Sequence, residues 1–317
     1  MTLREAIGQY IAWRRAQGAR FQSQAYALRR YCRRVGDGVD CDAVRSDQVS
    51  AFLAGGTPAS SNQVFLYCTL ASFYRYAIAR SLATRSPLPV EAPKAPPSAP
   101  PYIYSRDELR RLLDAVKTYR KRVNQLEPHT FHALLLVLYG AGLRRGEALS
   151  LTLADIDLRA AVLTVRATKF DKTRLIPLGP QLARAMREYA AQRTACGASQ
   201  AHEAPFFVNR DGTPLAARTV SKAFVQLRRA AGVGRENGAR NQPRLHDLRH
   251  SFAVHRLTAW YRQGADVQRM LPLLSTYLGH ASVAGTQVYL TMTPELLGEA
   301  ALRFERYVQT GTGGGDD

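Results

Sequence analysis

The sequence predicts a mainly α-helical fold with a small antiparallel β-sheet, arranged as a helical N-terminal domain and an α+β C-terminal domain. Three observations support this. Apolar residues recur at helical spacing along most of the chain, only two short segments have strand patterns, and a proline-rich stretch interrupts the helical pattern. With 317 residues, of which 46% are apolar, the chain is long enough to bury the cores of two domains.

The clearest boundary is the proline-rich stretch over residues 87–101. Seven of its fifteen residues are proline, which lacks a backbone N–H and favours an extended spacer over a helix or strand. We therefore expect a helical domain at 1–86, a linker at 87–101 and a larger domain at 102–308. The last residues, 309–317, are rich in glycine and are expected to form a flexible tail.

The first domain is predicted to contain four helices. Each combines apolar residues at helical spacing with a recognisable boundary. Ser46 is expected to cap the third helix, and Ser60 or Ser61 to open the fourth. The predicted helices span residues 3–18, 23–35, 46–54 and 61–80.

The same domain is strongly basic, with 12 arginines against 5 acidic residues. Arg29, Arg30, Arg33 and Arg34 are predicted to lie along one side of the second helix. A solvated helix face is the usual explanation for such a run, but no acidic residue is interleaved with it. We therefore interpret the four arginines as a surface that faces phosphate groups.

The second domain mixes helices with a predicted β-hairpin. Residues 161–166 and 174–178 have strand patterns and flank a tip that carries Lys169 and Lys172. Residues 130–140 are apolar nearly all round, which predicts a buried helix. The other predicted helices span residues 107–120, 180–195, 217–231, 246–263, 266–278, 282–290 and 294–308.

The composition indicates a polyanionic partner. Lysine and arginine together number 44, of which 38 are arginine, against 25 acidic residues, and the net charge is +19. A GC-rich genome would explain the ratio of arginine to lysine but not the net charge. Because a guanidinium binds phosphate through two parallel hydrogen bonds, we expect a nucleic acid as the partner.

Simple patterns exclude several classes of protein. The N-terminal segment carries early charges and has no signal-peptide core, and the longest apolar run, 133–143, is shorter than the ~20 residues of a membrane span. The four cysteines form no C-x-x-C pair, and no G-x-G-x-x-G or Walker A motif is present. We expect a soluble, cytosolic protein.

Four short stretches carry polar residues that a structural role alone does not explain well. The first, 140–147, is a glycine-rich turn that places Arg144 and Arg145 at a helix start. The helix dipole disfavours cations there unless an anion is close. The second stretch is the hairpin with its two lysines.

The third and fourth stretches lie nearer the C-terminus. In segment 246–250, His246 and Arg249 share one helical face. Segment 278–289 contains His280 and ends in Tyr289. The polar residues of these two stretches, like those of the first two, are hard to explain by structure alone.

Each stretch also has an ordinary structural explanation. Arg144 fits a surface arginine paired with Glu147 equally well, and Tyr289 alone is most often a core or interface residue. His246, His250 and His255 suggest a metal site, but no cysteine and few carboxylates lie nearby, so we expect none. The combination of all four stretches favours a functional site.

This combination resembles the tyrosine recombinase (phage integrase) family, in particular its Xer-type and transposon-encoded members. The resemblance covers nearly the whole chain. It rests on GLRRGEAL, the strand RLIPLG, HDLRHSFA, and LGHAS followed nine residues later by the tyrosine of TQVYLTMT. Matched motif by motif, it implies the catalytic residues Arg144, Lys169, His246, Arg249, His280 and Tyr289.

The resemblance also implies supporting residues. Glu147 would orient Arg144 or His246 without contacting the substrate itself. Lys172 is the alternative to Lys169, and Lys172 and Arg174 are expected to contact DNA. No metal ion, cofactor or ATP is implied, because arginines supply the positive charge and the covalent intermediate retains the energy of the phosphodiester bond.

The implied activity is site-specific recombination of DNA. Tyr289 would attack a phosphodiester to form a 3′-phosphotyrosyl enzyme and free a 5′-hydroxyl. Arginines and His280 would hold the charged phosphate oxygens. His246 would accept or relay the tyrosine proton, and Lys169 would protonate the leaving oxygen.

The implied assembly is a homo-tetramer on two duplex DNA sites that passes through a Holliday junction. An accessory protein or a partner recombinase is a further expectation. The amphipathic segment 294–307 packs either on its own domain or on a neighbouring subunit. Two other functions stay open: a type IB topoisomerase-like enzyme that relaxes DNA, and a DNA-binding regulator without catalysis.

The sequence departs from the family pattern in two places. The interval from Arg249 to His280 is 31 residues, longer than in typical Xer-type members, and the extra residues are expected in segment 268–275. This departure concerns the local path of the chain before His280. The second, minor departure is Ser86-Pro87, where the family often has Asn-Pro.

Overall fold

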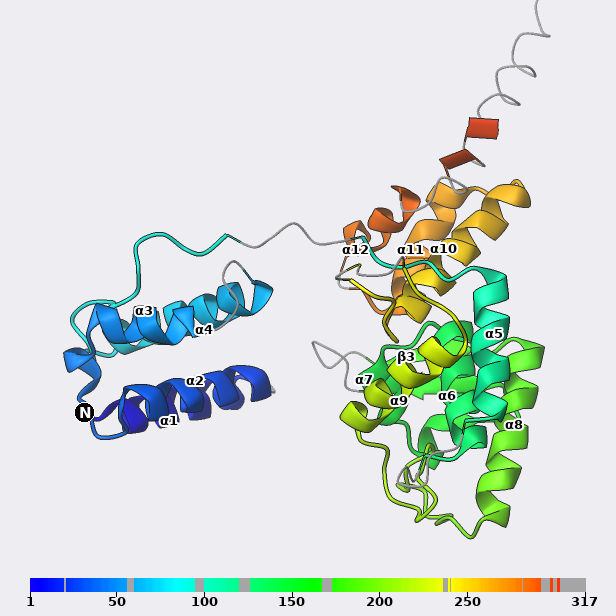
Figure 1. The fold of residues 1–317 in the computed structure, drawn as a ribbon, viewed down its shortest axis with the longest axis horizontal. Helices are drawn as coiled ribbons and strands as arrows, with labels where there is room; N and C mark the ends of the chain where they lie inside the picture. Colours follow the sequence, from blue (N-terminus) through cyan, green and yellow to red (C-terminus); the bar gives the residue numbers. More distant parts are fainter. Residues whose placement is uncertain are drawn as a thin grey trace, which may run out of the picture. The chain divides into compact units, whose positions relative to one another are not determined.

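The computed structural model describes residues 1–19, 21–55, 60–94, 100–119, 126–166, 173–235, 239, 241–280, 282–291, 297–298 and 301–302. Contacts between Cα atoms divide the chain into two compact units, residues 1–98 and 99–317. Both units are mainly helical, and the second contains a small antiparallel sheet, as the sequence predicts (Figure 1).

In its described residues, the first unit consists of α1 (Leu3–Ala16), α2 (Gln22–Val35), the 3₁₀ turn η1 (Cys41–Ala43), α3 (Ser46–Ala54) and α4 (Ser61–Ala79). A capping box opens α1, because Thr2 and Glu5 each accept a hydrogen bond from the other's backbone N–H. Aromatic rings fill the core, and Tyr31 and Tyr74 share a buried hydrogen bond of 2.7 Å.

Ser46 does not cap α3 and is instead its first residue. The extended residue before it, Arg45, occupies the cap position, and its backbone N–H donates to Gln48 Oε1 at 3.0 Å. The glutamine side chain thus satisfies a backbone donor at the helix start. Ser60 does cap α4 and accepts from the backbone of Gln63.

The four arginines of α2 form two pairs on the exposed side of the helix. Arg29 and Arg33 border a groove between α1 and α2, whereas the guanidinium of Arg30 lies over the ring of Phe52, 5.1 Å from its centroid. Successive residues of a helix are about 100° apart, which separates the two pairs. All four arginines are exposed, including Arg34.

The larger core of the second unit joins four helices to the sheet. The helices are α5 (Arg106–Lys117), α6 (Pro128–Gly140), α8 (Pro180–Ala195) and α9 (Ala217–Ala230). The sheet has the order β1 (Ile156–Asp157), β2 (Val162–Val165) and β3 (Arg174–Pro177), with all neighbours antiparallel. Leu163 pairs with Ile176, and both side chains are fully buried in this core.

Two short elements, α7 (Arg145–Leu149) and the 3₁₀ turn η2 (Leu153–Asp155), connect α6 to the sheet. The sequence indicated the hairpin of β2 and β3 and the helix start at Arg144 and Arg145, but neither η2 nor the two-residue strand β1. Elements this short carry too few residues for a periodic pattern.

A second, smaller core lies at the end of this unit where Figure 1 places α10, α11 and α12. Its elements are α10 (Asp247–Arg262), α11 (Val267–Leu278), α12 (Ala284–Gln287) and the 3₁₀ turn η3 (Val288–Thr291). The helix expected at 282–290 is therefore a short α-helix that tightens into a 3₁₀ turn, a common ending for helices. The segment 268–275 lies within α11, so the extra residues expected before His280 are part of this helix.

Among the described residues, no helix has both the length and the apolar character needed to cross a membrane.

Candidate active site

Five of the six predicted catalytic residues lie in one connected group. Arg144, His246, Arg249, His280 and Tyr289 come from four different segments, and each contacts another member or the backbone beside one. The predicted lysines, Lys169 and Lys172, lie outside the described residues.

The C-terminal end of α11 anchors three arginines. Its last carbonyls, which have no partner within the helix, accept hydrogen bonds in consecutive order. Arg174 Nε donates to Tyr277 O at 3.0 Å, and Arg249 Nη2 donates to Leu278 O at 2.6 Å. Arg144 Nη2 donates to Gly279 O at 2.9 Å. The negative end of the helix dipole favours these three cations.

Glu147 lies between the same three guanidinium groups. Its Oε1 accepts from Arg144 Nη1 at 2.8 Å and from Arg174 Nη1 at 3.1 Å. Its Oε2 accepts from Arg174 Nη2 at 2.8 Å and from the backbone N–H of Arg144 at 2.8 Å, and lies 3.9 Å from Arg249 Nη1. Burial alone would raise the pKa of Glu147, but these hydrogen bonds and charges outweigh it and hold the pKa below its usual value.

Arg144 therefore has both roles considered from the sequence. It is paired with Glu147, as an ordinary surface arginine would be. It also lies at the start of α7 and donates a hydrogen bond to the carbonyl of Gly279 at the end of α11. Its side chain is 37% exposed, the most accessible of the three guanidinium groups. Arg144 is the arginine of the cluster best able to reach a ligand from solvent.

Arg249 lies deeper, with 2% of its surface exposed. Besides Leu278, it donates to the carbonyl of Gly142 at 2.7 Å. Burial lowers the pKa of Arg249 to about 10, so its charge is retained at neutral pH. Gly142 has φ +59°, and a Cβ there would stand 2.7 Å from the ring of Phe252. The glycine-rich turn thus lets the backbone approach α10 closely enough to receive Arg249.

The structure corrects the expectation that Arg174 contacts DNA. Only 9% of its side chain is exposed, and all three guanidinium nitrogens donate to Glu147 or to Tyr277 O. Because the side chain is buried beneath α11 and its three nitrogens are held by Glu147 and Tyr277, Arg174 does not lie on a surface that a DNA phosphate can reach. The sequence alone does not show whether a basic side chain at the start of a strand faces solvent or the protein interior.

Tyr289 is buried beside this cluster, with 2% of its surface exposed. Its hydroxyl forms a hydrogen bond of 3.0 Å with His250 Nδ1. Burial raises the pKa of Tyr289, whereas the charge of Arg249 and a hydrogen bond from it act in the opposite direction. The phenol therefore stays protonated at neutral pH and has a histidine at its oxygen.

His280 lies near the ring of Tyr289, with centroids 6.1 Å apart, and its Nδ1 forms a hydrogen bond of 2.7 Å with Thr286 Oγ1. Burial and the nearby arginines lower the pKa values of His280 and His250 to about 4 each. Both rings are therefore neutral at pH 7, and each has one N–H donor and one acceptor nitrogen.

His246 is exposed at the N-terminal end of α10, and its ring centroid lies 4.8 Å from that of His250. The sequence predicted that His246 accepts or relays the tyrosine proton, and in the structure it is His250 whose ring forms the hydrogen bond with Tyr289. His250 was considered only as a metal ligand. Its position four residues after His246, on the same helical face, was the signal available in the sequence.

Among the described residues, no group of three or more histidine, cysteine, aspartate or glutamate side chains is arranged to hold a metal ion.

Comparison with known proteins agrees with this arrangement of residues. The model of the phage integrase family matches residues 103–295. A Sinorhizobium fredii protein named as a candidate integrase/recombinase, y4rB, is 36% identical over 310 residues, covering 96% of this chain and 98% of its own. The tyrosine recombinase XerC of Lacticaseibacillus casei is 34% identical over 230 residues, covering 71% of this chain and 70% of its own.

The fold has counterparts among solved structures. A lambda integrase tetramer bound to a Holliday junction superposes with a TM-score of 0.65 at 18% identity, covering 91% of this chain and 77% of that one. The family model covers more than half of the chain, and the y4rB relative covers nearly all of it. The chain therefore belongs to the phage integrase family, the family of the tyrosine recombinases.

Proposed function

We propose that this protein is a site-specific recombinase that cuts and rejoins DNA through a covalent bond to Tyr289. The proposal rests mainly on the position of the Tyr289 hydroxyl. It is hydrogen-bonded to His250 and lies next to Arg249 of the arginine cluster. In the reaction, the tyrosine oxygen attacks phosphorus and forms a P–O bond. The bond from phosphorus to the 5′-oxygen breaks and leaves a 3′-phosphotyrosyl enzyme.

Arg144 and Arg249 stabilise the negative charge that develops on the phosphate oxygens. Three guanidinium groups against the single carboxylate of Glu147 leave the cluster with a net charge of +2. This charge is fixed before the substrate arrives, which is the arrangement that lowers the barrier most effectively. His280, near the ring of Tyr289, adds a hydrogen-bond donor to the same oxygens.

The phenol proton passes to a histidine. His250 is neutral at pH 7 and its Nδ1 already lies 3.0 Å from the tyrosine oxygen. His246, in ring contact with His250 and exposed, relays the proton to solvent. The leaving 5′-oxygen takes its proton from Lys169 of the β2–β3 connection, with Lys172 as the alternative donor.

The protein acts as a homo-tetramer on two duplex sites through a Holliday junction, in the bacterial cytoplasm on the nucleoid. The lambda integrase tetramer on a Holliday junction supports this by its fold. Arg29, Arg30, Arg33 and Arg34 contact DNA phosphates from the exposed side of α2. An accessory protein or a partner recombinase assists the choice of sites.

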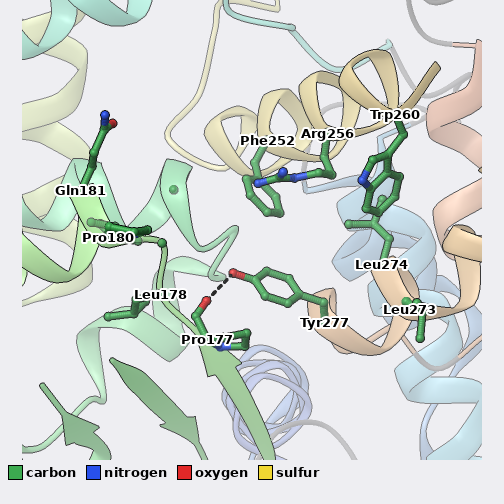
Figure 2. A pocket seen from close by; sticks show the side chains of 13 residues that line it. Pro177, Leu178, Pro180, Gln181, Phe252, Arg256, Trp260, Leu273, Leu274 and Tyr277 are labelled. Atoms are coloured by element: carbon green, nitrogen blue, oxygen red, sulfur yellow. Dashed lines mark hydrogen bonds between the residues drawn. The ribbon is translucent and has the colours of Figure 1, made fainter. Parts of the chain in front are cut away.

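The subunits join through the C-terminal segment of a second copy, which occupies an apolar pocket of about 760 Å³ between α8, α10 and α11 (Figure 2). Leu273 at the pocket and Leu297 and Leu302 in the segment are each at least half exposed, which favours pairing of the two surfaces. In Leu273→Glu, we expect DNA binding by single subunits to persist and the tetramer to be lost in sedimentation on DNA. An intact tetramer would contradict this part of the proposal.

Covalent trapping tests the function. Wild type and Tyr289→Phe are incubated with nicked duplexes from the DNA that flanks the protein's own gene, and then denatured in detergent. We expect a DNA adduct with wild type, unaffected by EDTA, and none with the variant. A plasmid that carries two copies of the cleaved site should yield exchanged products.

The other two functions give different outcomes. Relaxation of supercoils without exchange would support the topoisomerase-like alternative, and binding without any adduct would support the regulator.

A further inference from the structure

We propose that Arg174 is a positioning residue for strand cleavage, which acts by neutralising Glu147 and so leaves the charge of Arg144 available to the phosphate. The inference rests on the proposed function, because it concerns the rate of the same reaction. Arg174 touches no substrate atom in this account and acts only through its neighbours.

The first support is the geometry of Arg174. Its Nη1 and Nη2 face the two oxygens of Glu147 in a paired contact of 3.1 and 2.8 Å, while its Nε donates to Tyr277 O. A forked guanidinium is the only side chain that makes all three bonds at once. Nine-tenths of the side chain is buried, so water screens the pair weakly.

The second support is the charge of the cluster. Glu147 has Arg144 on one side and Arg174 on the other. Without Arg174, the full charge of the carboxylate would act on Arg144, and the net charge of the cluster would fall from +2 to +1. An arginine held by an uncompensated buried carboxylate donates less readily to an incoming phosphate.

The third support is the link between the sheet and α11. Arg174 opens β3, and Tyr277 Oη donates to Pro177 O at the other end of that strand, at 3.4 Å (Figure 2). Gly279, whose carbonyl accepts from Arg144, packs on the guanidinium of Arg174 so closely that a Cβ would stand 2.7 Å from Nη1. Arg174 therefore also fixes the backbone that orients Arg144.

The test measures the rate of adduct formation at saturating enzyme on a nicked duplex. We expect Arg174→Met to form the adduct about a hundredfold more slowly than wild type, near the lower limit for loss of a preorganised electrostatic contact. Arg174→Lys keeps the charge but not the fork, and we expect an intermediate rate. Affinity for DNA and its dependence on salt should stay unchanged, because Arg174 faces no phosphate.

A charge suppressor separates positioning from a structural role. In the double variant Arg174→Met with Glu147→Gln, the net charge returns to +2, and we expect the rate to recover about tenfold over Arg174→Met alone. Loss of packing alone would instead make the two substitutions additive and the double variant slower. Arg166→Met is the matched control, since Arg166 pairs with the buried Asp155 beside the same hairpin, whereas the described ion pairs of Glu147 are with Arg144, Arg174 and Arg249. We expect it to cleave at the wild-type rate.

The outcomes are distinguishable. A wild-type rate in Arg174→Met, or a double variant no faster than Arg174→Met, overturns the positioning role while leaving the proposed function intact. Absence of any adduct with wild type contradicts the proposed function and the inference together. Melting temperatures of all the variants identify any that fail to fold. If Arg174→Met does not fold, the rate of adduct formation of Arg174→Lys is compared with that of wild type instead.

Discussion

Individual backbone positions decide whether the arginine cluster can form. Gly279 ends α11 in the left-handed conformation, with φ +68°, and its α-carbon lies against Arg174. The same residue presents its carbonyl to Arg144. Gly279 thus ends the helix, allows the guanidinium of Arg174 to pack closely against it, and orients the guanidinium of Arg144 through its carbonyl.

Gly279→Ala should therefore be more destabilising than an ordinary substitution of a left-handed glycine. The backbone strain alone costs about 1–2 kcal/mol, and the clash with Arg174 adds to it. Gly264→Ala is the control, because Gly264 has φ +70° with no atom within 4 Å of the added carbon. Urea unfolding should give a larger loss for Gly279→Ala, and equal losses at the two positions would show that the close packing has no energetic effect.

At the residue scale, the sequence predicts side-chain identity better than side-chain direction. Arg144, Arg249, His280 and Tyr289 lie together as the motifs indicate. Arg174 was expected at the DNA surface but is buried, because its strand starts beneath α11. Which partner covers a charged side chain depends on contacts between segments distant in the sequence, and no local pattern records these.

Among the elements, α11 has the largest effect on the site. Its C-terminal carbonyls hold three arginines, while its apolar face packs on α10 and Tyr289 in the smaller core. The helix also contains Pro272 in its interior, in the segment expected to hold the extra residues. Proline there removes one backbone hydrogen bond from the helix.

Pro272→Ala should stabilise the protein. Pro272 is exposed, so the substitution leaves no cavity, and restoring the helix hydrogen bond is expected to contribute about 1–3 kcal/mol. Differential scanning calorimetry should show a higher Tm for the variant, with the rate of adduct formation unchanged. A lower Tm would mean that the proline stabilises the helix path, contrary to this account.

Elements differ in how well the sequence defines them. Helices α4, α6 and α10 are predicted within a few residues, because each has many apolar positions at regular spacing. Strand β1 and the turns η2 and η3 are only two to four residues long, and their backbone follows the packing around them. The short helix α7 is defined mainly by the contact of Glu147 with Arg144.

For the whole molecule, the neutral histidines of the site link stability to pH. His250 and His280 have pKa values of about 4 in the folded protein, below the ordinary 6.5 of an unfolded chain. Between these values the unfolded state binds more protons, so stability is lost as pH falls. Glu147, with its lowered pKa, contributes stability above pH 4.5 and loses it only at lower pH.

The free energy of unfolding in urea should therefore decrease as pH is lowered from about 6.5 to about 4.5. The double variant His250→Gln with His280→Gln should flatten this decrease, since glutamine does not titrate. A curve with the same slope in the variant would mean that other groups cause the acid sensitivity.

The net charge of +19 predicts strongly salt-dependent binding to DNA. Each phosphate contact releases a counterion, so the affinity of a protein with several such contacts should fall at least about a hundredfold between about 50 and 200 mM salt. Fluorescence anisotropy with a labelled duplex measures this directly. An affinity that barely changes over that range would contradict the expectation from charge.

In the proposed reaction Tyr289 becomes covalently attached to DNA, so mapping the attached residue is the decisive experiment. The trapped adduct is digested with protease and nuclease, and the modified peptide is sequenced by mass spectrometry. We predict a single nucleotide linked through its 3′-phosphate to the peptide that contains Tyr289. Attachment to any of the other 14 of the chain's 15 tyrosines, or to a serine, would contradict the account.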